Sequence, residues 1–112
     1  MGSEMCIRDS SNVIENLSDI APDLARYIIE FAFGQIYERP GLSLQERELL
    51  TLSSLLTAGG CETQLQVHIN AALHVGIKEE KIIEAFLHCI PYTGFPKVLN
   101  AVAVAGQIFS GK

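Results

Sequence analysis

Apolar residues recur along this chain at the three- and four-residue spacing of amphipathic helices. From residue 21 to about residue 39, Leu24, Ile28 and Phe31 share one helical face, and Pro22 and Asp23 suit the first turn. The same spacing predicts further helices over residues 12–19, 43–58, 61–75, 79–92 and 96–109. The alternating pattern of a β-strand is absent from the sequence. The chain is therefore predicted to form an all-α bundle of five or six helices.

Turn residues separate these helices. Pro40 and Gly41 should end the first long helix, and Gly59 and Gly60 should end the next. Gly76 fits the left-handed position that follows a helix C-terminus. Because Pro91 lies inside the last turn of the helix predicted over residues 79–92, we expect a kink or an early end there.

The length of 112 residues suits one domain. Residues 1–10 lack both periodicity and capping residues, so we interpret them as a disordered or tag-like tail and residues 11–112 as a single domain. The three cysteines have no disulfide or zinc spacing, which favours a reducing, cytoplasmic setting and predicts no metal site.

Charge is scarce and unevenly placed. With 8 Lys and Arg against 13 Asp and Glu, the net charge is −5, and no basic cluster favours nucleic acid or an anionic membrane as a partner. Apolar runs are too short to span a bilayer, which predicts a soluble protein. Glu62 is the only charged residue between residues 49 and 77, and Glu84 and Lys97 are the only ones between 82 and 111. Such surfaces predict a homo-oligomer.

Candidate chemistry concentrates at the helix predicted from residue 61. Cys61, Gln64 and His68 are spaced to share one helical face, and Cys61 lies at the N-terminus, where the helix dipole can activate a thiol. Glu48, on the preceding antiparallel helix, should face His68 at a similar height. A carboxylate that orients an imidazole forms a general acid–base pair.

Three separated blocks of the sequence resemble the carboxymuconolactone decarboxylase family, which includes the alkylhydroperoxidase D proteins. The blocks are residues 34–52 (GQIYERPGL leading into ERELLTL), residues 64–76 (QLQVHINAAL with VG), and residues 79–101 (EE and IE, then YTGFP and NA). The resemblance implies an all-helical fold of the alkylhydroperoxidase D type. It also implies a trimer or hexamer, with the active site between helices and near subunit contacts.

The resemblance distinguishes two activities. The peroxidase branch has the pattern Cys-x-x-Cys-x-x-x-His, whereas this chain has Gln64 at the second cysteine position, so Cys61 lacks a local resolving thiol. The decarboxylase branch does not need that thiol. We therefore expect cofactor-free decarboxylation of a small lactone acid. His68 would be the general acid–base group oriented by Glu48, with Gln64, Tyr92 and Phe95 binding the substrate.

Other interpretations of these residues stay open. His68 is also typical of a hydrogen-bonded core histidine, Glu48 of a carboxylate that serves the helix dipole, and Cys61 of a small capping residue. A hydroperoxide reductase that uses Cys61, with Cys89 as a distant partner thiol, is one alternative function. A non-catalytic oligomeric scaffold is another. His74, His88 and Cys89 are expected to be structural, surface or core residues.

Overall fold

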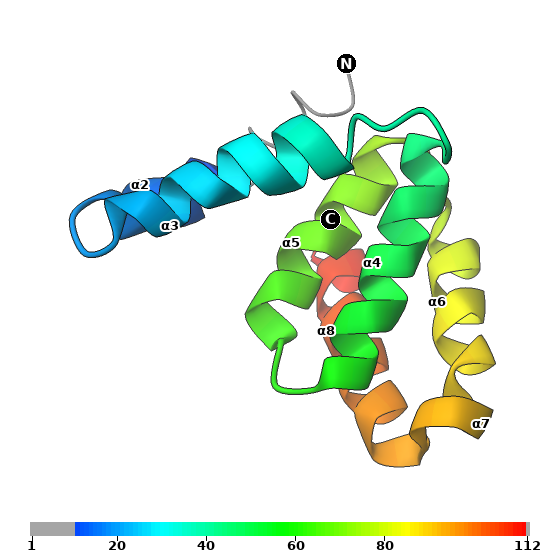
Figure 1. The fold of residues 1–112 in the computed structure, drawn as a ribbon. Helices are drawn as coiled ribbons and strands as arrows, with labels where there is room; N and C mark the ends of the chain where they lie inside the picture. Colours follow the sequence, from blue (N-terminus) through cyan, green and yellow to red (C-terminus); the bar gives the residue numbers. More distant parts are fainter. Residues whose placement is uncertain (1–10, 112) are drawn as a thin grey trace. The chain divides into compact units, whose positions relative to one another are not determined.

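The computed structural model describes residues 11–111, in which every regular element is a helix (Figure 1). In chain order these are α2 (Ser11–Ser18), α3 (Pro22–Tyr27), the π-helix η1 (Ile28–Ile36), α4 (Leu44–Ala58), α5 (Glu62–His74), α6 (Glu79–His88), α7 (Ile90–Thr93) and α8 (Phe95–Ser110). The prediction of an all-α fold is confirmed for these residues. The predicted tail over residues 1–10 lies outside them.

The described chain forms two compact units, one ending at Leu44 and the other beginning at Gln45. The N-terminal unit holds α2, α3 and η1, and the C-terminal unit holds α5 to α8 with nearly all of α4. The interpretation of residues 11–112 as one domain stays a prediction.

The long helix of the N-terminal unit changes its hydrogen bonding at Ile28. Over η1 the backbone forms a π-helix, and at its end the N–H of Tyr37 donates to the carbonyl of Ala32, five residues back, at 2.9 Å. The sequence predicts a helix here, which is confirmed, but the prediction of an α-helix is wrong from Ile28 to Ile36, where the helix is a π-helix. A nearly continuous apolar run does not distinguish four-residue from five-residue bonding.

The predicted inward face of this helix is also wrong in part. Phe31 is 56% exposed and Leu24 is 49% exposed, whereas Ala25 and Phe33 are the buried residues among residues 14–44. The rings of Phe33 and Tyr37 meet edge to face at 5.7 Å. The wider turn of η1 gives Phe33, rather than Phe31, the buried position.

The C-terminal unit has a closed apolar core. In Figure 1, α4 lies between α5 and α6 in the view, and α8 passes behind them. The large, fully buried side chains of this core are Leu52, Leu56, Ile69, Ile82 and Phe86. Helix α8 packs against α5 and α6 and contributes the fully buried Ala101 and Ala105. These small side chains allow close packing of the helix backbones.

The turns around α5 form as predicted. Gly59 and Gly60 have φ values of 77° and 70°, so the turn that reverses the chain between α4 and α5 uses left-handed backbone. Gly76 has φ 96°, and the N–H groups of Gly76 and Ile77 donate to the carbonyls of Leu73 and Ala72. This pair of bonds is a Schellman motif, which ends α5.

Pro91 interrupts the helix predicted over residues 79–92, as expected. Helix α6 ends at His88, and Pro91 lies in the first turn of the short α7. Gly94, with φ 98°, then redirects the chain into α8, which begins at Phe95. Among the described residues, no helix is both long and apolar enough to cross a membrane.

Candidate functional site

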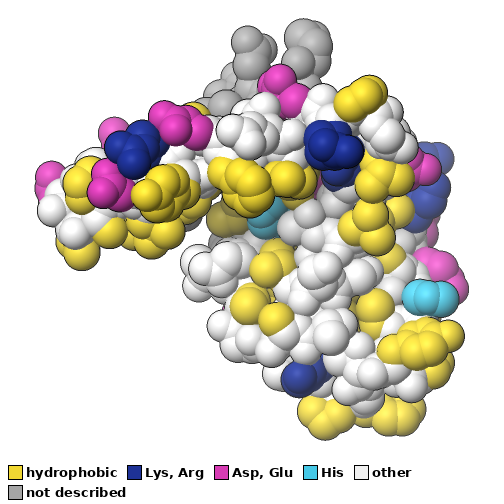
Figure 2. Space-filling model, viewed as in Figure 1, with side chains coloured by type: hydrophobic (Ala, Val, Ile, Leu, Met, Phe, Trp, Pro, Cys, Tyr) yellow, Lys and Arg dark blue, Asp and Glu magenta, His cyan; other side chains and the backbone are white. Residues whose placement is uncertain are grey.

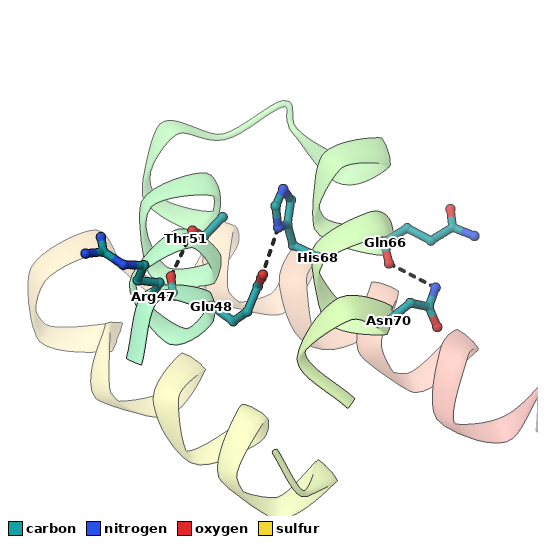
Figure 3. A network of polar contacts seen from close by, with 6 residues as sticks. All are labelled: Arg47, Glu48, Thr51, Gln66, His68 and Asn70. Atoms are coloured by element: carbon teal, nitrogen blue, oxygen red, sulfur yellow. Dashed lines mark hydrogen bonds and ion pairs between the residues drawn. The ribbon is translucent and has the colours of Figure 1, made fainter. Parts of the chain in front are cut away.

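Glu48 and His68 meet between α4 and α5. The Nδ1 atom of His68 lies 3.0 Å from Oε1 of Glu48, and Figure 3 shows the two side chains directed toward one another. The Gly59–Gly60 turn makes the two helices antiparallel, which brings residues twenty positions apart to one level. The predicted contact is confirmed, and its catalytic role stays a prediction.

The pair combines a buried carboxylate with a partly accessible ring. The side chain of Glu48 is 0% exposed, whereas that of His68 is 18% exposed. A buried charge is costly unless it is paired and hydrogen-bonded, so the imidazole stabilises the carboxylate in this position. When Glu48 is ionised it only accepts, and Nδ1–H of His68 is then the donor. Proton exchange by the ring is thereby directed to Nε2.

The neighbours of the pair hold it in the helix interface. Leu52, four residues after Glu48 on α4, and Ile69, next to His68 on α5, are fully buried and belong to the core. Figure 3 shows Arg47 extending away from His68, while Gln66 and Asn70 lie on the part of α5 away from Glu48. In this Glu48–His68 pair, hereafter called the dyad, Glu48 is buried with the core of the C-terminal unit and His68 is partly exposed.

Cys61 and Cys89 are both free thiols. Cys61 is the N-cap residue of α5, is partly buried, and donates from Sγ to the carbonyl of Gly59 at 3.4 Å. Cys89 is buried in the core and donates to the carbonyl of Ala85 at 3.4 Å, which confirms its expected core position. The cavity lined by Cys61 has a volume of about 10 Å³, which is near the minimum that holds one water.

The three predicted substrate-binding residues are all exposed. Gln64 lies one turn before His68 on α5. Tyr92 is 79% exposed in α7, and Phe95 is 65% exposed at the start of α8. Exposure of this degree means that, within one chain, Tyr92 and Phe95 do not form the walls of an enclosed apolar pocket. Their role in binding stays a prediction.

Two polar contacts of α4 were not predicted from the sequence. Nε2 of Gln45 donates to the carbonyl of Val75 at 2.8 Å, and Nζ of Lys97 donates to the carbonyl of Thr57 at 2.9 Å. Both acceptors are backbone carbonyls, which carry no sequence signal. Gln45 also borders a groove of about 540 Å³ that is lined by Leu49, Gly76, Ile77, Lys78, Glu80, Lys81 and Glu84.

The other two histidines lie at the surface. His74 and His88 are exposed, in the last turns of α5 and α6, and the ring of His88 contacts Tyr92 at a centroid distance of 5.7 Å. The expectation that His74 and His88 are surface or structural residues agrees with these positions. Within residues 11–111, no group of three His, Cys, Asp or Glu side chains is arranged to hold a metal ion.

Comparison with known proteins identifies the family. Residues 22–107 match the model of the carboxymuconolactone decarboxylase family. The chain is 35% identical over 96 residues to 4-carboxymuconolactone decarboxylase of Acinetobacter baylyi, covering 86% of this chain and 71% of the relative. It is 33% identical over 93 residues to nitrosuccinic acid decarboxylase of Metarhizium robertsii, covering 83% of this chain and 64% of that relative. The chain belongs to the carboxymuconolactone decarboxylase family.

Proposed function

We propose that this member of the family is a cofactor-free decarboxylase of a small lactone acid, of the 4-carboxymuconolactone type, with His68 as the general acid–base group and Glu48 as its orienting partner. The single observation that carries the proposal is the 3.0 Å contact between His68 Nδ1 and the fully buried Glu48 carboxylate. Two similar proteins that are named decarboxylases support the reaction class.

The substrates named for these two relatives suggest how the reaction proceeds without a cofactor. One is a lactone that carries a carboxyl group, and the other is a nitro acid. Lactone carbonyl and nitro groups both accept an electron pair. When the bond between the carboxylate and its carbon breaks, carbon dioxide leaves and the pair moves into the substrate's own carbonyl as an enolate. Hydrogen-bond donors near the enolate oxygen lower this barrier.

His68 then supplies the proton. In the imidazolium form, Nε2–H donates to the enolate oxygen or transfers its proton to the carbanion carbon, while Nδ1–H continues to donate to Glu48. The balance is one carboxylate and one proton consumed, with one carbon dioxide and one carbon–hydrogen bond formed. Solvent water returns the proton to Nε2. Glu48 accepts in both states of the ring, so it fixes which nitrogen exchanges the proton.

The other predicted residues receive smaller roles. Gln64 would offer a carboxamide to the lactone or to a carboxylate, and its exposure one turn before His68 supports this role. Tyr92 and Phe95 supply apolar contact surface for the substrate. Cys61 is a candidate catalytic residue by position, and its bond to Gly59 fits equally well with a capping role.

The decisive test replaces His68 and compares it with a second histidine of the same helix. Wild-type protein, His68→Ala and the control His74→Ala would be assayed by the ultraviolet absorbance change as 4-carboxymuconolactone is consumed. We expect His68→Ala to lower kcat at least about 100-fold, the usual contribution of a general acid or base. His74→Ala should keep wild-type activity, because His74 is exposed in the last turn of α5.

Two outcomes would reject the proposal. If His68→Ala retains the wild-type rate, His68 is a structural histidine. If wild-type protein does not consume the lactone, the substrate assignment fails. Thiol loss from Cys61 on hydroperoxide addition would then favour the peroxidase alternative, and unchanged thiols would favour a scaffold.

We also propose that the protein self-associates, with a second copy of this chain as the partner. Large apolar side chains stay exposed on both units. In the N-terminal unit they are Ile20, Leu24, Tyr27, Ile29, Phe31, Ile36 and Leu42, and in the C-terminal unit they include Leu87, Tyr92, Phe95 and Leu99. Figure 2 shows apolar side chains gathered along the helices of the N-terminal unit and near α7. Surfaces of this kind are typical of interfaces.

A further inference from the structure

A hydrogen bond from a residue outside the dyad connects the N-terminal end of α4, which carries Glu48, to α5. Gln45 lies in the first turn of α4, and its Nε2–H donates to the backbone carbonyl of Val75, thirty residues later, at 2.8 Å. Val75 is the C-cap of α5, the helix that carries His68. The bond therefore joins the beginning of one dyad helix to the end of the other.

The way in which α5 ends makes the Val75 carbonyl available. In the Schellman motif, the carbonyls of Ala72 and Leu73 accept from Ile77 and Gly76, and the chain then turns away at the left-handed Gly76. The carbonyl of Val75 lies beyond these two, where the helix no longer continues to supply a backbone N–H donor. The carboxamide of Gln45 supplies a donor in its place. A Cβ atom at Gly76 would lie 3.4 Å from Nε2 of Gln45, an ordinary contact distance, so glycine is favoured here by its φ of 96° and not by the approach of Gln45.

Gln45 stands in a fixed relation to Glu48. Residues three apart on a helix are neighbours on one face, separated by about 4.5 Å along the axis. The side chains of Gln45 and Glu48 accordingly both reach α5, one at Val75 and the other at His68. These two bonds lie about one turn apart along α4 and about two turns apart along α5, and the bond to Val75 is at the end of α5 opposite the Gly59–Gly60 turn.

The opposite end of α4 is fastened differently. Lys97, from α8, donates to the carbonyl of Thr57 in the last turn of α4, and the hydroxyls of Thr57 and Thr93 lie 3.1 Å apart. These contacts connect α4 to α7 and α8 rather than to α5. The two ends of α4 thus offer a matched pair of side-chain bonds to backbone carbonyls, one near the dyad and one remote from it.

We propose that Gln45 is a positioning residue, which holds Glu48 against His68 by fastening the first turn of α4 to the end of α5. The proposal rests on the function assigned to the dyad. Without the bond, the first turn of α4 can shift or rotate relative to α5, which lengthens the 3.0 Å contact between Glu48 and His68. Catalytic groups must be held within about 0.5 Å of the productive geometry, so a small shift lowers the rate without removing either member of the dyad.

The test compares Gln45→Met, which keeps the length of the side chain but removes the donor, with Gln45→Lys, which restores a donor. Lys97→Met is the matched control at the remote end of α4. Two quantities would be measured for each variant. One is the proton resonance of the His68 Nδ1–H that donates to Glu48, identified by its loss in His68→Ala. The other is kcat and KM for 4-carboxymuconolactone.

We expect Gln45→Met to broaden or abolish the His68 Nδ1–H resonance and to lower kcat about five- to tenfold with KM nearly unchanged, since positioning and not binding is lost. Gln45→Lys should largely restore both the His68 Nδ1–H resonance and kcat. Lys97→Met should keep both while lowering the melting temperature, because it removes a cation and a bond from the C-terminus of α4.

Three results would overturn the proposal: an unchanged resonance in Gln45→Met, an equal loss in Lys97→Met, or no recovery in Gln45→Lys. The resonance does not depend on turnover, so it tests the positioning role of Gln45 separately from the proposed decarboxylase function. If wild-type protein shows the resonance but does not consume the lactone, the proposed function fails and the resonance alone decides the role of Gln45. If Gln45→Met melts lower than Lys97→Met does, recovery in Gln45→Lys distinguishes lost donation from a general loosening.

Discussion

The two compact units of this chain use apolar residues in opposite ways. The C-terminal unit buries Phe86, Ile82 and Ile69 completely, and it also buries the Glu48 carboxylate. The N-terminal unit leaves Leu24 and Phe31 about half exposed on a helix that is partly a π-helix. The comparison shows that apolar residues form a closed core in one unit and an exposed face in the other.

The charge-poor stretches of the sequence, residues 49–77 and 82–111, both lie in the C-terminal unit, where apolar residues form a core and the buried carboxylate has a specific partner. The N-terminal unit carries more charge, such as Asp23 and Arg26, and its apolar side chains stay exposed in the described chain. The first arrangement suits a site for chemistry, because rigid, fully packed neighbours hold catalytic groups in place. The exposed apolar surface of the N-terminal unit suits association, and we propose that a second copy of the chain covers it.

The sharpest way to separate the units is to remove one aromatic ring from each. Phe86→Ala should lower the unfolding free energy of the C-terminal unit by about 3–5 kcal/mol, because it leaves a cavity in a closed core. Phe31→Ala should change it by less than about 0.5 kcal/mol, since Phe31 is exposed and lies in the other unit. Hydrogen exchange of the α8 backbone amides reports this free energy.

The outcome that contradicts this contrast is equal acceleration of α8 amide exchange in the two variants. The stability of the C-terminal unit would then depend on the ring of Phe31, and the distinction drawn between the units would not hold for stability.

A smaller effect is expected from removing the charge of Glu48 while keeping its shape. Glu48→Gln should lower kcat about 10- to 100-fold, which corresponds to the loss of one charge-assisted hydrogen bond in the transition state. Glu46→Gln, two residues earlier and exposed, is the matched control and should retain wild-type kcat. Steady-state kinetics with 4-carboxymuconolactone measures both, and equal rates in the two variants would assign Glu48 a purely structural role.

The smallest expected effect concerns the exposed face of the N-terminal unit. Phe31→Lys should reduce the mass of the assembly measured by light scattering after size exclusion, because a charge in an apolar interface is costly to bury. Gln35→Lys adds the same charge at an exposed polar position of the same helix and should leave the mass unchanged. A monomeric wild-type protein would reject self-association, and an unchanged mass in Phe31→Lys would place the interface elsewhere.

Much of the fold could be predicted from local sequence. Gly59–Gly60 and Gly76 mark chain reversals because left-handed backbone favours glycine, and Pro91 interrupts a helix because it lacks an N–H donor. The meeting of Glu48 and His68 could be predicted as well, since a short turn between two helices sets which levels face each other. Each of these inferences depends on residues close in sequence or separated by one regular element.

Other features had no such signal. The π-helical bonding of η1, the exposure of Phe31 and the bond from Gln45 to Val75 all depend on which backbone groups lie opposite a side chain. A backbone carbonyl is the same at every position, so a sequence pattern does not reveal which one accepts. Tyr92 and Phe95 were expected to bind the substrate, whereas their exposure depends on how α7 and α8 leave the core of the unit.

The sequence by itself determined that this chain is helical, where its turns fall, and that a carboxylate and an imidazole would meet between two antiparallel helices. Its blocks of similarity also pointed to the decarboxylase family, which the comparisons establish. Only the tertiary structure decided that Glu48 is fully buried while His68 is partly exposed. It also decided that Gln45, at the start of α4, donates to the carbonyl of Val75 at the end of α5. The physical reason is that periodicity and turns are local properties, whereas burial and hydrogen-bond partners depend on all the elements packed around a residue.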